Sequence, residues 1–319
     1  MNDLEIRPLR AGEEHLFNSY PYPTNPEVGY EARVSYAERR ERNEYRPEHT
    51  WVAIRDGVVV ARAAWWAGPE DNRPGALDWL EAEPGPGQRA LATAVLHAAH
   101  PHVRTAGGDL PDYHLLLPTD WKERPDIREQ AEYRLLAAAD AGLKPFVERI
   151  SYRWLAEADG LPERGARLRF VPADDEAFLP ALRGVLEGTL DAYSRRDIAT
   201  HGLDEAAAIQ LRGLHWFPSP REWWQLAYTR AGELIGLIVP ARNYQMPTIG
   251  YLGVVPAQRG HGYVDDLLAE MAWRLGELAP GEEVGADTDV GNIPMARAFA
   301  RAGFRADATR IVMTEFGVG

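Results

Sequence analysis

A glycine-rich stretch in the second half of the chain has the composition of a phosphate-binding turn. Residues 256–263 read Pro-Ala-Gln-Arg-Gly-His-Gly-Tyr, and the apolar residues 248–255 before them are typical of a strand. The residues that follow, 264–273, place apolar side chains at helical spacing. A strand, a glycine turn and a helix N-terminus direct backbone N–H groups and a positive dipole end to one place, which suits a pyrophosphate. The residues expected to contact it are Arg259, Gly260, His261, Gly262, Tyr263 and Val264.

Two common nucleotide-binding signatures are absent from this stretch. No Gly-Lys-Ser/Thr follows the glycines, and the spacing G-x-G-x-x-G does not occur in it. An ordinary strand-to-helix turn punctuated by glycines would show the same local pattern. Tyr263 could then pack beneath the loop rather than contact a ligand.

A second block, residues 287–304, combines carboxylates with a capped helix. Asn292 precedes a Pro by two positions, an order that caps and starts a short helix, and Gly303 is placed to end it in the left-handed conformation. Asp287 and Asp289 come before this helix at the end of an expected strand, with both side chains on one face. Two close carboxylates raise the pKa of one of them, which suits the transfer of a proton from an amine. Asp289 could equally cap the following turn.

In this order, the two blocks resemble those of the GCN5-related N-acetyltransferases. The first matches the family's Arg/Gln-x-x-Gly-x-Gly/Ala signature at Arg259 and Gly262, with Val264 where Gly or Ala is usual. The second follows the pattern Asn-x-x-Ala-x-x-x-Tyr-x-x-x-Gly-Phe from Asn292 onward, with Met295 in place of the Ala and Phe299 in place of the Tyr.

The resemblance covers residues 168–319 and implies an acyltransferase that uses acetyl-CoA as cosubstrate and no metal. It implies direct transfer of the acetyl group to a primary amine, carried by a small molecule or a peptide. The strand ending at Val255 would diverge from its parallel neighbour and leave a V-shaped slot for the pantetheine arm. The backbone N–H of Val254, or of its neighbour, would polarise the thioester. The further residues implied to contact the cosubstrate are Leu252, Val255, Asn292 and Phe299.

The residues for proton transfer depart from the family pattern. Phe299 stands where the family places its usual general acid, a Tyr, and a Phe side chain cannot donate a proton. We therefore expect Tyr251 and Asp287 to take part in catalysis, although Tyr251 could instead be a half-buried aromatic of the sheet. Aromatic side chains could form the wall of a pocket for a cationic or apolar amine, or they could belong to the hydrophobic core. The residues expected to bind the amine are Trp216, Trp224 and Asp289.

The composition excludes several classes of protein. The chain has 319 residues, of which 45% are hydrophobic, and no Cys, which is typical of two globular domains without disulfides or thiolate chemistry. A formal net charge of −13 argues against binding to a nucleic acid. The charged N-terminus lacks a signal-peptide core, and no apolar run approaches the length of a membrane span. We expect a cytoplasmic protein with no membrane partner, and a homodimer is compatible with its aromatic content.

The two halves of the sequence are similar to each other. Ala-Gly-Leu at 141–143 corresponds to Ala-Gly-Phe at 302–304, and each half has an expected β-hairpin around a glycine turn, at 51–64 and 224–239. In the first half, Pro86 removes a backbone donor where the second half has its loop. We therefore expect an α/β fold of two tandem domains, each a twisted, mostly antiparallel sheet flanked by helices. The expected domains are residues 1–157, a degenerate copy, and 166–319, which binds acyl-CoA.

A second interpretation of the same motifs is a module that binds acyl-CoA and has weak or no turnover. Phe299 and Val264 are substitutions that such a loss would leave. A nucleotide-binding enzyme of another fold is disfavoured, because metal-ligand and phosphate-transfer motifs are missing.

Overall fold

The computed structural model describes residues 4–29 and 35–316. They form two compact units: unit 1, from Met1–Glu148 and Ala308–Gly319, and unit 2, Arg149–Asp307. β6 (Lys144–Trp154) begins in unit 1 and ends in unit 2, and β12 (Arg305–Thr314) begins in unit 2 and ends in unit 1. Each half of the sequence therefore contributes its last strand to the unit built mainly by the other half, while the predicted boundary at residues 157–166 separates the sequence repeats.

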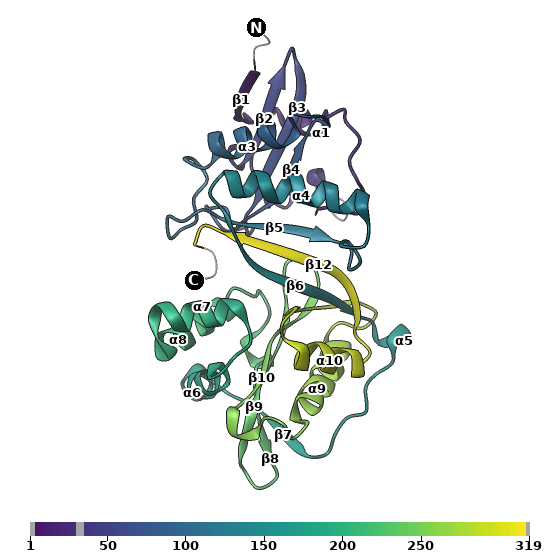
Figure 1. Ribbon diagram of the computed structural model, residues 1–319. Helices are drawn as coiled ribbons and strands as arrows, with labels where there is room; N and C mark the ends of the chain where they lie inside the picture. Colours follow the sequence, from purple (N-terminus) through teal and green to yellow (C-terminus); the bar gives the residue numbers. More distant parts are fainter. Residues whose placement is uncertain (1–3, 30–34, 317–319) are drawn as a thin grey trace. The chain divides into compact units, whose positions relative to one another are not determined.

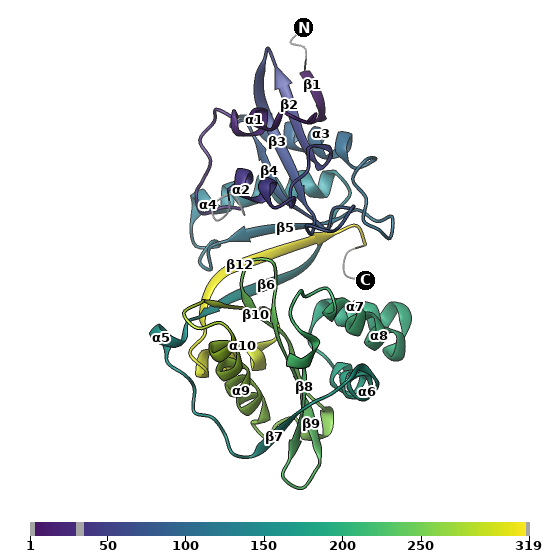
Figure 2. The same cartoon turned by 180° about the vertical axis from the view of Figure 1, so that it is seen from behind.

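Unit 1 is a mixed sheet with helices on both faces (Figures 1 and 2). Its strand order is β1-β2-β3-β4-β5-β12, and its neighbours are antiparallel except for β4 and β5. The other strands are β1 (Leu4–Pro8), β2 (Thr50–Arg55), β3 (Val58–Trp66), β4 (Ala76–Ala82) and β5 (Asp112–Leu117). The described helices are α1 (Glu14–Asn18), α2 (Tyr36–Glu41), η2 (Pro47–His49), α3 (Gln88–Ala99) and α4 (Pro125–Asp140).

The two faces of unit 1 have separate cores. Leu91, Val95 and Ala99 recur at helical spacing along α3 and are buried with residues of β3 to β5 and α4. On the opposite face, Phe17 of α1 and Tyr36 of α2 stack with ring centroids 4.0 Å apart. The sheet is thus covered on both sides, so its strands are apolar on both faces.

A buried carboxyl group lies in this second core. Asp78 of β4 is 6% exposed and accepts a hydrogen bond of 2.9 Å from the hydroxyl of Tyr45. Burial raises the pKa of Asp78 to about 7, against the lowering effect of the Arg39 charge. The folded protein therefore holds a proton on this group at pH values where the unfolded chain has lost it.

This proton makes the stability of unit 1 depend on pH. Since the pKa of Asp78 is raised from 3.8, its contribution is greatest in acid and is lost as the pH rises towards 7, on the order of 2–4 kcal/mol in all. We expect Asp78→Asn to flatten the urea-unfolding free energy between about pH 4 and 8. Asp120→Asn, at a side chain that is 61% exposed, is the control and should keep the wild-type slope. An unchanged slope in Asp78→Asn would contradict the assignment.

Unit 2 repeats this architecture with the order β6-β11-β10-β9-β8-β7, in which only β10 and β11 are parallel. The other strands are β7 (Leu168–Pro172), β8 (Gln225–Thr229), β9 (Leu234–Arg242), β10 (Pro247–Val254) and β11 (Val284–Asp289). The described helices are α5 (Ala156–Asp159), α6 (Asp175–Leu186), α7 (Ala192–His201), α8 (Leu203–Leu214), η3 (Arg221–Trp223), η4 (Pro256–Gln258), α9 (Tyr263–Leu278) and α10 (Ile293–Arg301).

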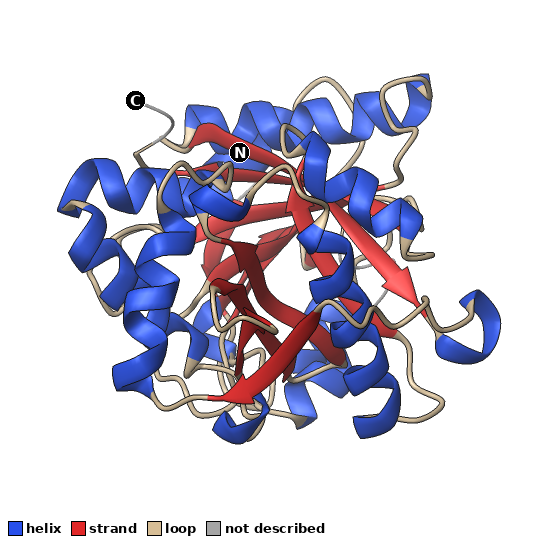
Figure 3. Cartoon of the chain, turned by 90° about the horizontal axis from the view of Figure 1, so that it is seen from below, coloured by secondary structure: helices blue, strands red, loops and turns tan. Residues whose placement is uncertain are grey.

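The helices of unit 2 divide between the two faces of its sheet. α6, α7 and α8 cover one face, while α9 and α10 cover the other, and strands lie between helical layers (Figures 1 and 3). Phe178 and Leu182 of α6 are buried with β8 and β9 on the first side. Leu268 and Met271 of α9 are buried with β6, β9 and β11 on the second. A residue of β10 therefore faces either α6 and α7 or α9, according to its place in the alternation.

The predicted fold class, α/β with helices flanking each sheet, is confirmed. Both predicted hairpins are present, and Asp56 and Gly57 take the positive φ angles, 51° and 79°, that a two-residue turn needs. Asn292 caps α10 by accepting from the N–H of Met295, and Gly303 after it has a φ of 84°. No described helix is long and apolar enough to cross a membrane.

The segment that joins the two expected domains, residues 157–165, packs against α9. Its first residues belong to α5, the indole of Trp273 donates to the carbonyl of Pro162 at 2.9 Å, and Arg164 binds both carboxylate oxygens of Glu270. These contacts place the segment within unit 2.

Candidate functional site

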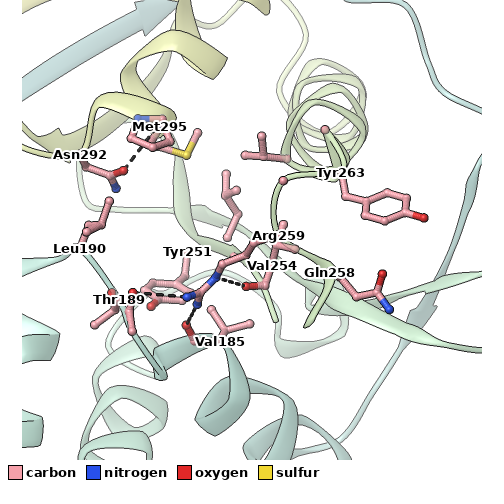
Figure 4. Close-up of a pocket in the computed structure, with 17 residues that line it drawn as sticks. Val185, Thr189, Leu190, Tyr251, Val254, Gln258, Arg259, Tyr263, Asn292 and Met295 are labelled. Carbon is pink, nitrogen blue, oxygen red and sulfur yellow. Dashed lines mark hydrogen bonds between the residues drawn. The ribbon is translucent and has the colours of Figure 1, made fainter. Parts of the chain in front are cut away.

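The site is an opening between two parallel strands. β10 pairs with β9 from Pro247 to Val254, but it pairs with β11 only at Thr248 and Gly285. Beyond that pair the strands diverge and leave a cavity of about 490 Å³. The cavity, shown in Figure 4, continues to the loop after β10 and to the start of α10. The divergence that the resemblance implied is therefore present.

Nine of the predicted residues line this cavity, and several lining residues were not predicted. The predicted ones are Tyr251, Leu252, Val254, Arg259, Gly260, Gly262, Tyr263, Val264 and Asn292. Those that the sequence did not single out include Val185, Thr189, Leu190, Gly253, Gln258 and Met295. Three of these come from the end of α6 and the segment after it, which has no motif of its own.

The backbone of Val254 faces the cavity. The N–H of Val255 donates to the carbonyl of Ile235 in β9, at 2.9 Å. Because the peptide bond is trans, the carbonyl of Val254 points the opposite way, towards the gap beside β11. The N–H and C=O of one strand residue share a side, so the N–H of Val254 points into the gap as well. A thioester carbonyl in the gap would meet this donor.

The loop after β10 and the start of α9 bring backbone N–H groups to one end of the cavity. Gly260 and Gly262 have φ angles of 82° and 75°, a conformation that side chains rarely adopt. Gly262 is the N-cap of α9 and supplies no side chain, so the first N–H groups of this 16-residue helix lack a side-chain cap. The dipole of α9 adds partial positive charge there. The geometry suits an anion.

An arginine outside the predicted motifs also contacts this loop. Arg167, just before β7, donates to the carbonyls of His261 and Gly262 at 3.1 and 3.2 Å and pairs with Asp266 in the first turn of α9. Asp265 in the same turn pairs with Arg301 at 2.6 Å. Asp265 and Asp266 are thus each paired with an Arg, which offsets the repulsion that their carboxylates would exert on a phosphate.

Arg259 makes a different set of contacts from those expected of a phosphate ligand. Its guanidinium donates to the carbonyls of Val254 at 3.0 Å, Val185 at 2.9 Å and Gly188 at 3.3 Å (Figure 4). The carbonyls of Val185 and Gly188 end α6, where the helix dipole favours a cation. Arg259 therefore ties the end of α6 to β10, and its predicted contact with a pyrophosphate stays a prediction.

Tyr251 lies on the face of β10 that α6 and α7 cover, and its ring lines the cavity. Burial raises the pKa of its hydroxyl, as does the nearby charge of Asp191, whereas a hydrogen bond with Ser194 and the charge of Arg259 lower it. Burial outweighs the rest, so this phenol is neutral at physiological pH.

The two predicted carboxylates on β11 differ in environment. Asp289 is 5% exposed, lies 3.1 Å from the Nε of Arg149 and accepts from the N–H of Ala192 at 2.6 Å. It thus anchors the first turn of α7. Asp287 is exposed and accepts from the hydroxyl of Ser151 at 2.5 Å. Neither lines the cavity, and their predicted roles towards an amine stay predictions.

The remaining predicted residues pack outside the cavity lining. Phe299 is 2% exposed and stacks on Tyr152 at 4.7 Å, and Trp224 is 2% exposed beside Phe178. Trp216 is 40% exposed and packs on Phe217 and Tyr244. Val255 packs against the core beside α6, and His261 is exposed in the loop. In the described residues, no three His, Cys, Asp or Glu side chains are grouped so that they could hold a metal ion.

No family model and no curated protein matches the sequence. Among solved structures, a GCN5-related N-acetyltransferase from Sphaerobacter thermophilus is similar over 98% of this chain and 95% of its own, with a TM-score of 0.58 and 16% identity. A tandem GNAT protein from the clavulanic acid biosynthesis pathway is similar over 98% of both chains, with a TM-score of 0.51 and 18% identity.

The chain has the tandem GNAT fold. The divergent parallel strands, the loop and the capped α10 of unit 2 are the parts of the GNAT fold that the two sequence blocks build. At these sequence identities, the comparison shows the fold and does not identify a substrate.

The close approach of α6 to β10 at the cavity gives a test of this geometry. A Cβ at Gly253 would lie 2.1 Å from Cγ1 of Val185, so Gly253→Ala should destabilise unit 2 by about 1–3 kcal/mol through overpacking. The double variant with Val185→Ala, which removes the clashing methyl group, should recover part of that loss relative to Val185→Ala alone. Urea unfolding of the four proteins measures the coupling, and strict additivity would contradict the contact.

Proposed function

We propose that this protein is an acyl-CoA-dependent N-acyltransferase that transfers an acetyl group from acetyl-CoA to a primary amine by direct attack. The observation that carries the proposal is the gap between β10 and β11, which opens at the backbone of Val254 and leads to the uncapped N-terminus of α9. A thioester group and a pyrophosphate group need these two features at the two ends of one cavity.

In the proposed reaction, the loop at Gly260 and Gly262 and the first turn of α9 bind the pyrophosphate. The pantetheine arm lies in the gap and its thioester carbonyl accepts from the N–H of Val254, which stabilises the negative charge that develops on the oxygen. The amine nitrogen attacks the carbonyl carbon, the C–N bond forms and the C–S bond breaks. The acceptor is a small molecule or a peptide with a free amino group.

A module that binds acyl-CoA without turnover is the second candidate. The observation in its favour is Phe299, which lies buried between Tyr152 and Phe304 and has no proton to donate. Turnover in this protein would need another group for proton transfer.

Binding is tested by calorimetric titration of the full chain with acetyl-CoA. We expect one site per chain with micromolar affinity. Gly262→Asp places a carboxylate against the pyrophosphate, and since unit charges 4 Å apart repel by about 4 kcal/mol at an effective dielectric constant of 20, affinity should fall by about 100-fold or more. Gly281→Asp is a matched control, because Gly281 also has a positive φ, 77°, with no atom near its Cβ position. Equal affinity of the two variants would overturn the proposed site.

Turnover separates the two candidate functions. With saturating acetyl-CoA and a panel of primary amines, an N-acyltransferase releases CoA thiol, which a thiol reagent detects, at a rate that depends on the amine. We expect such release from the wild type and none from Gly262→Asp at the same concentrations. Tight binding with no amine-dependent release would favour the binding module.

A further inference from the structure

The segment between α5 and β7 runs along α9 and ends beside the loop of the site (Figures 1 and 2). Trp273, Glu270 and Asp266 of α9 are spaced by three or four positions, so they share the face of the helix that this segment covers. Arg164 pairs with Glu270 at 2.7 Å. The backbone at Gly165 comes so close to Asp266 that a Cβ there would overlap with the carboxylate. The segment is thus held against α9 up to the first turn of that helix.

Arg167, at the end of this segment, is fixed on both sides. The carbonyl of Ala166 before it accepts a hydrogen bond of 3.0 Å from Nε of Arg230. Leu168 after it is the first residue of β7 and pairs with β8. The guanidinium of Arg167 lies over the ring of Tyr263, 4.8 Å from its centroid. The sheet therefore sets the backbone of Arg167, and the side chain extends to the start of α9.

The guanidinium of Arg167 fixes the direction of two peptide groups in the loop. It donates to the carbonyls of His261 at 3.1 Å and Gly262 at 3.2 Å. In a trans peptide the N–H points opposite to the C=O, so the N–H groups of Gly262 and Tyr263 point away from Arg167. Gly262 and Tyr263 line the cavity and Arg167 does not. These two N–H groups are therefore directed to the cavity side of the loop.

The hydrogen-bonding capacity of Arg167 is largely used by the protein itself. Besides the two carbonyls, it binds both carboxylate oxygens of Asp266, one through Nε and one through Nη2. A guanidinium has five N–H groups, and these contacts use one from Nε, one from Nη1 and two from Nη2. Arg167 is thus bound to the loop and to the first turn of α9, an arrangement that suits a residue that shapes a site rather than one that binds its ligand.

We propose that Arg167 is the positioning residue of this loop, which holds the N–H groups of Gly262 and Tyr263 towards the pyrophosphate of acyl-CoA. The inference rests on the proposed N-acyltransferase function for the identity of the ligand. Glycine tolerates many backbone conformations, so without Arg167 the loop at Gly260 and Gly262 can turn a carbonyl towards the cavity, where it would repel a phosphate. A loop that is already ordered binds its ligand at a smaller entropic cost.

The first readout needs no ligand and reports on one peptide group. The full chain is labelled with ¹³C′-histidine and ¹⁵N-glycine, so that only a Gly directly after a His gives a signal in a carbonyl-to-amide NMR experiment. The sequence has two such pairs, His201-Gly202 and His261-Gly262, and loss of one signal in His201→Gln assigns both. We expect Arg167→Ala to shift the His261-Gly262 signal, because Arg167 donates to that carbonyl, and to leave His201-Gly202 unchanged.

The same spectrum tests whether the N–H of Gly262 faces the ligand. Addition of acetyl-CoA to the wild type should shift the Gly262 signal and not that of Gly202. Inorganic pyrophosphate should also shift Gly262, because it presents the same anionic group. A shift with pyrophosphate but no binding of acetyl-CoA would support the positioning and overturn the proposed function. A Gly262 signal that neither probe shifts would overturn the positioning.

The second readout is the affinity for acetyl-CoA, measured by calorimetric titration. We expect Arg167→Ala to weaken binding by about 10-fold or more, because the loop must then be ordered on binding. Arg167→Lys should recover part of the loss, since an ammonium keeps the charge beside Asp266 and can donate to one of the carbonyls. The double variant Arg167→Ala/Asp266→Asn separates orientation from charge and should still bind weakly. Wild-type affinity in the double variant would show that Arg167 only neutralises Asp266, which would overturn the positioning.

Arg305→Ala is the matched control. The Arg305 side chain is 55% exposed and pairs with Asp159 at 2.8 Å, much as Arg167 is 51% exposed and pairs with Asp266. Arg305 begins β12, so this variant removes the same charge from unit 2 at another element. It should keep both the wild-type affinity and the wild-type His261-Gly262 signal. An Arg167→Ala protein that matches this control in either readout would overturn the positioning.

Discussion

The site of unit 2 depends on a constraint of backbone hydrogen bonding. Two parallel strands that stay in register satisfy each other's N–H and C=O groups, whereas β10 and β11 meet only at Thr248 and Gly285. The groups beyond that pair need other partners. The guanidinium of Arg259 takes one, the carbonyl of Val254, and a bound ligand is the natural partner for others. Separation of two strands thus supplies both the space for a ligand and the polar groups that would orient it.

Unit 1 has the same strand order but different side chains at the corresponding strand, β4. Residues 77–84 of the first half, Leu-Asp-Trp-Leu-Glu-Ala-Glu-Pro, correspond to residues 249–256 of the second, since each is an apolar strand that ends in a Pro. Glu81 of β4 then takes the place of Gly253, and Trp79 that of Tyr251. Glu81 is buried, binds Arg62 and accepts from the indole of Trp79 at 3.1 Å. The guanidinium of Arg62 lies over the ring of Phe17, 4.7 Å from its centroid. Gly253 thus lets α6 approach β10 in unit 2, whereas the corresponding residue in unit 1, Glu81, forms an ion pair.

The sequence allowed the prediction of those features that local patterns encode. The hairpins, the cap at Asn292, the left-handed Gly303 and the loop at Gly260 and Gly262 each depend on a few neighbouring residues with special conformations. Nine cavity residues were predicted because they lie in or beside those patterns. The fold class followed from their order.

The lining residues from α6 and from the segment after it were not predicted, because their position depends on tertiary contacts. Val185, Thr189 and Leu190 belong to a region with no motif, and only the packing of α6 against the sheet brings them to the cavity. Arg167 contacts a loop residue that lies 94 positions later in the sequence. Conversely, Trp224 and Phe299 were predicted to contact a ligand but are buried in the core. An aromatic side chain can line a binding site or fill a core, and the sequence does not show which of the two it does.

The exchange of last strands between the two halves bears on how the chain is made. β5 of unit 1 pairs with residues 309–313 of β12, which are synthesised after all of unit 2. Until they emerge, the edge of β5 is unpaired, and the first half waits incomplete while the second is synthesised. Synthesis of unit 1 thus begins before that of unit 2 and is completed after it. A chain that stops between the two sequence repeats lacks one strand of the unit 1 sheet, so genetic separation of the two halves would remove one strand from the sheet of each unit.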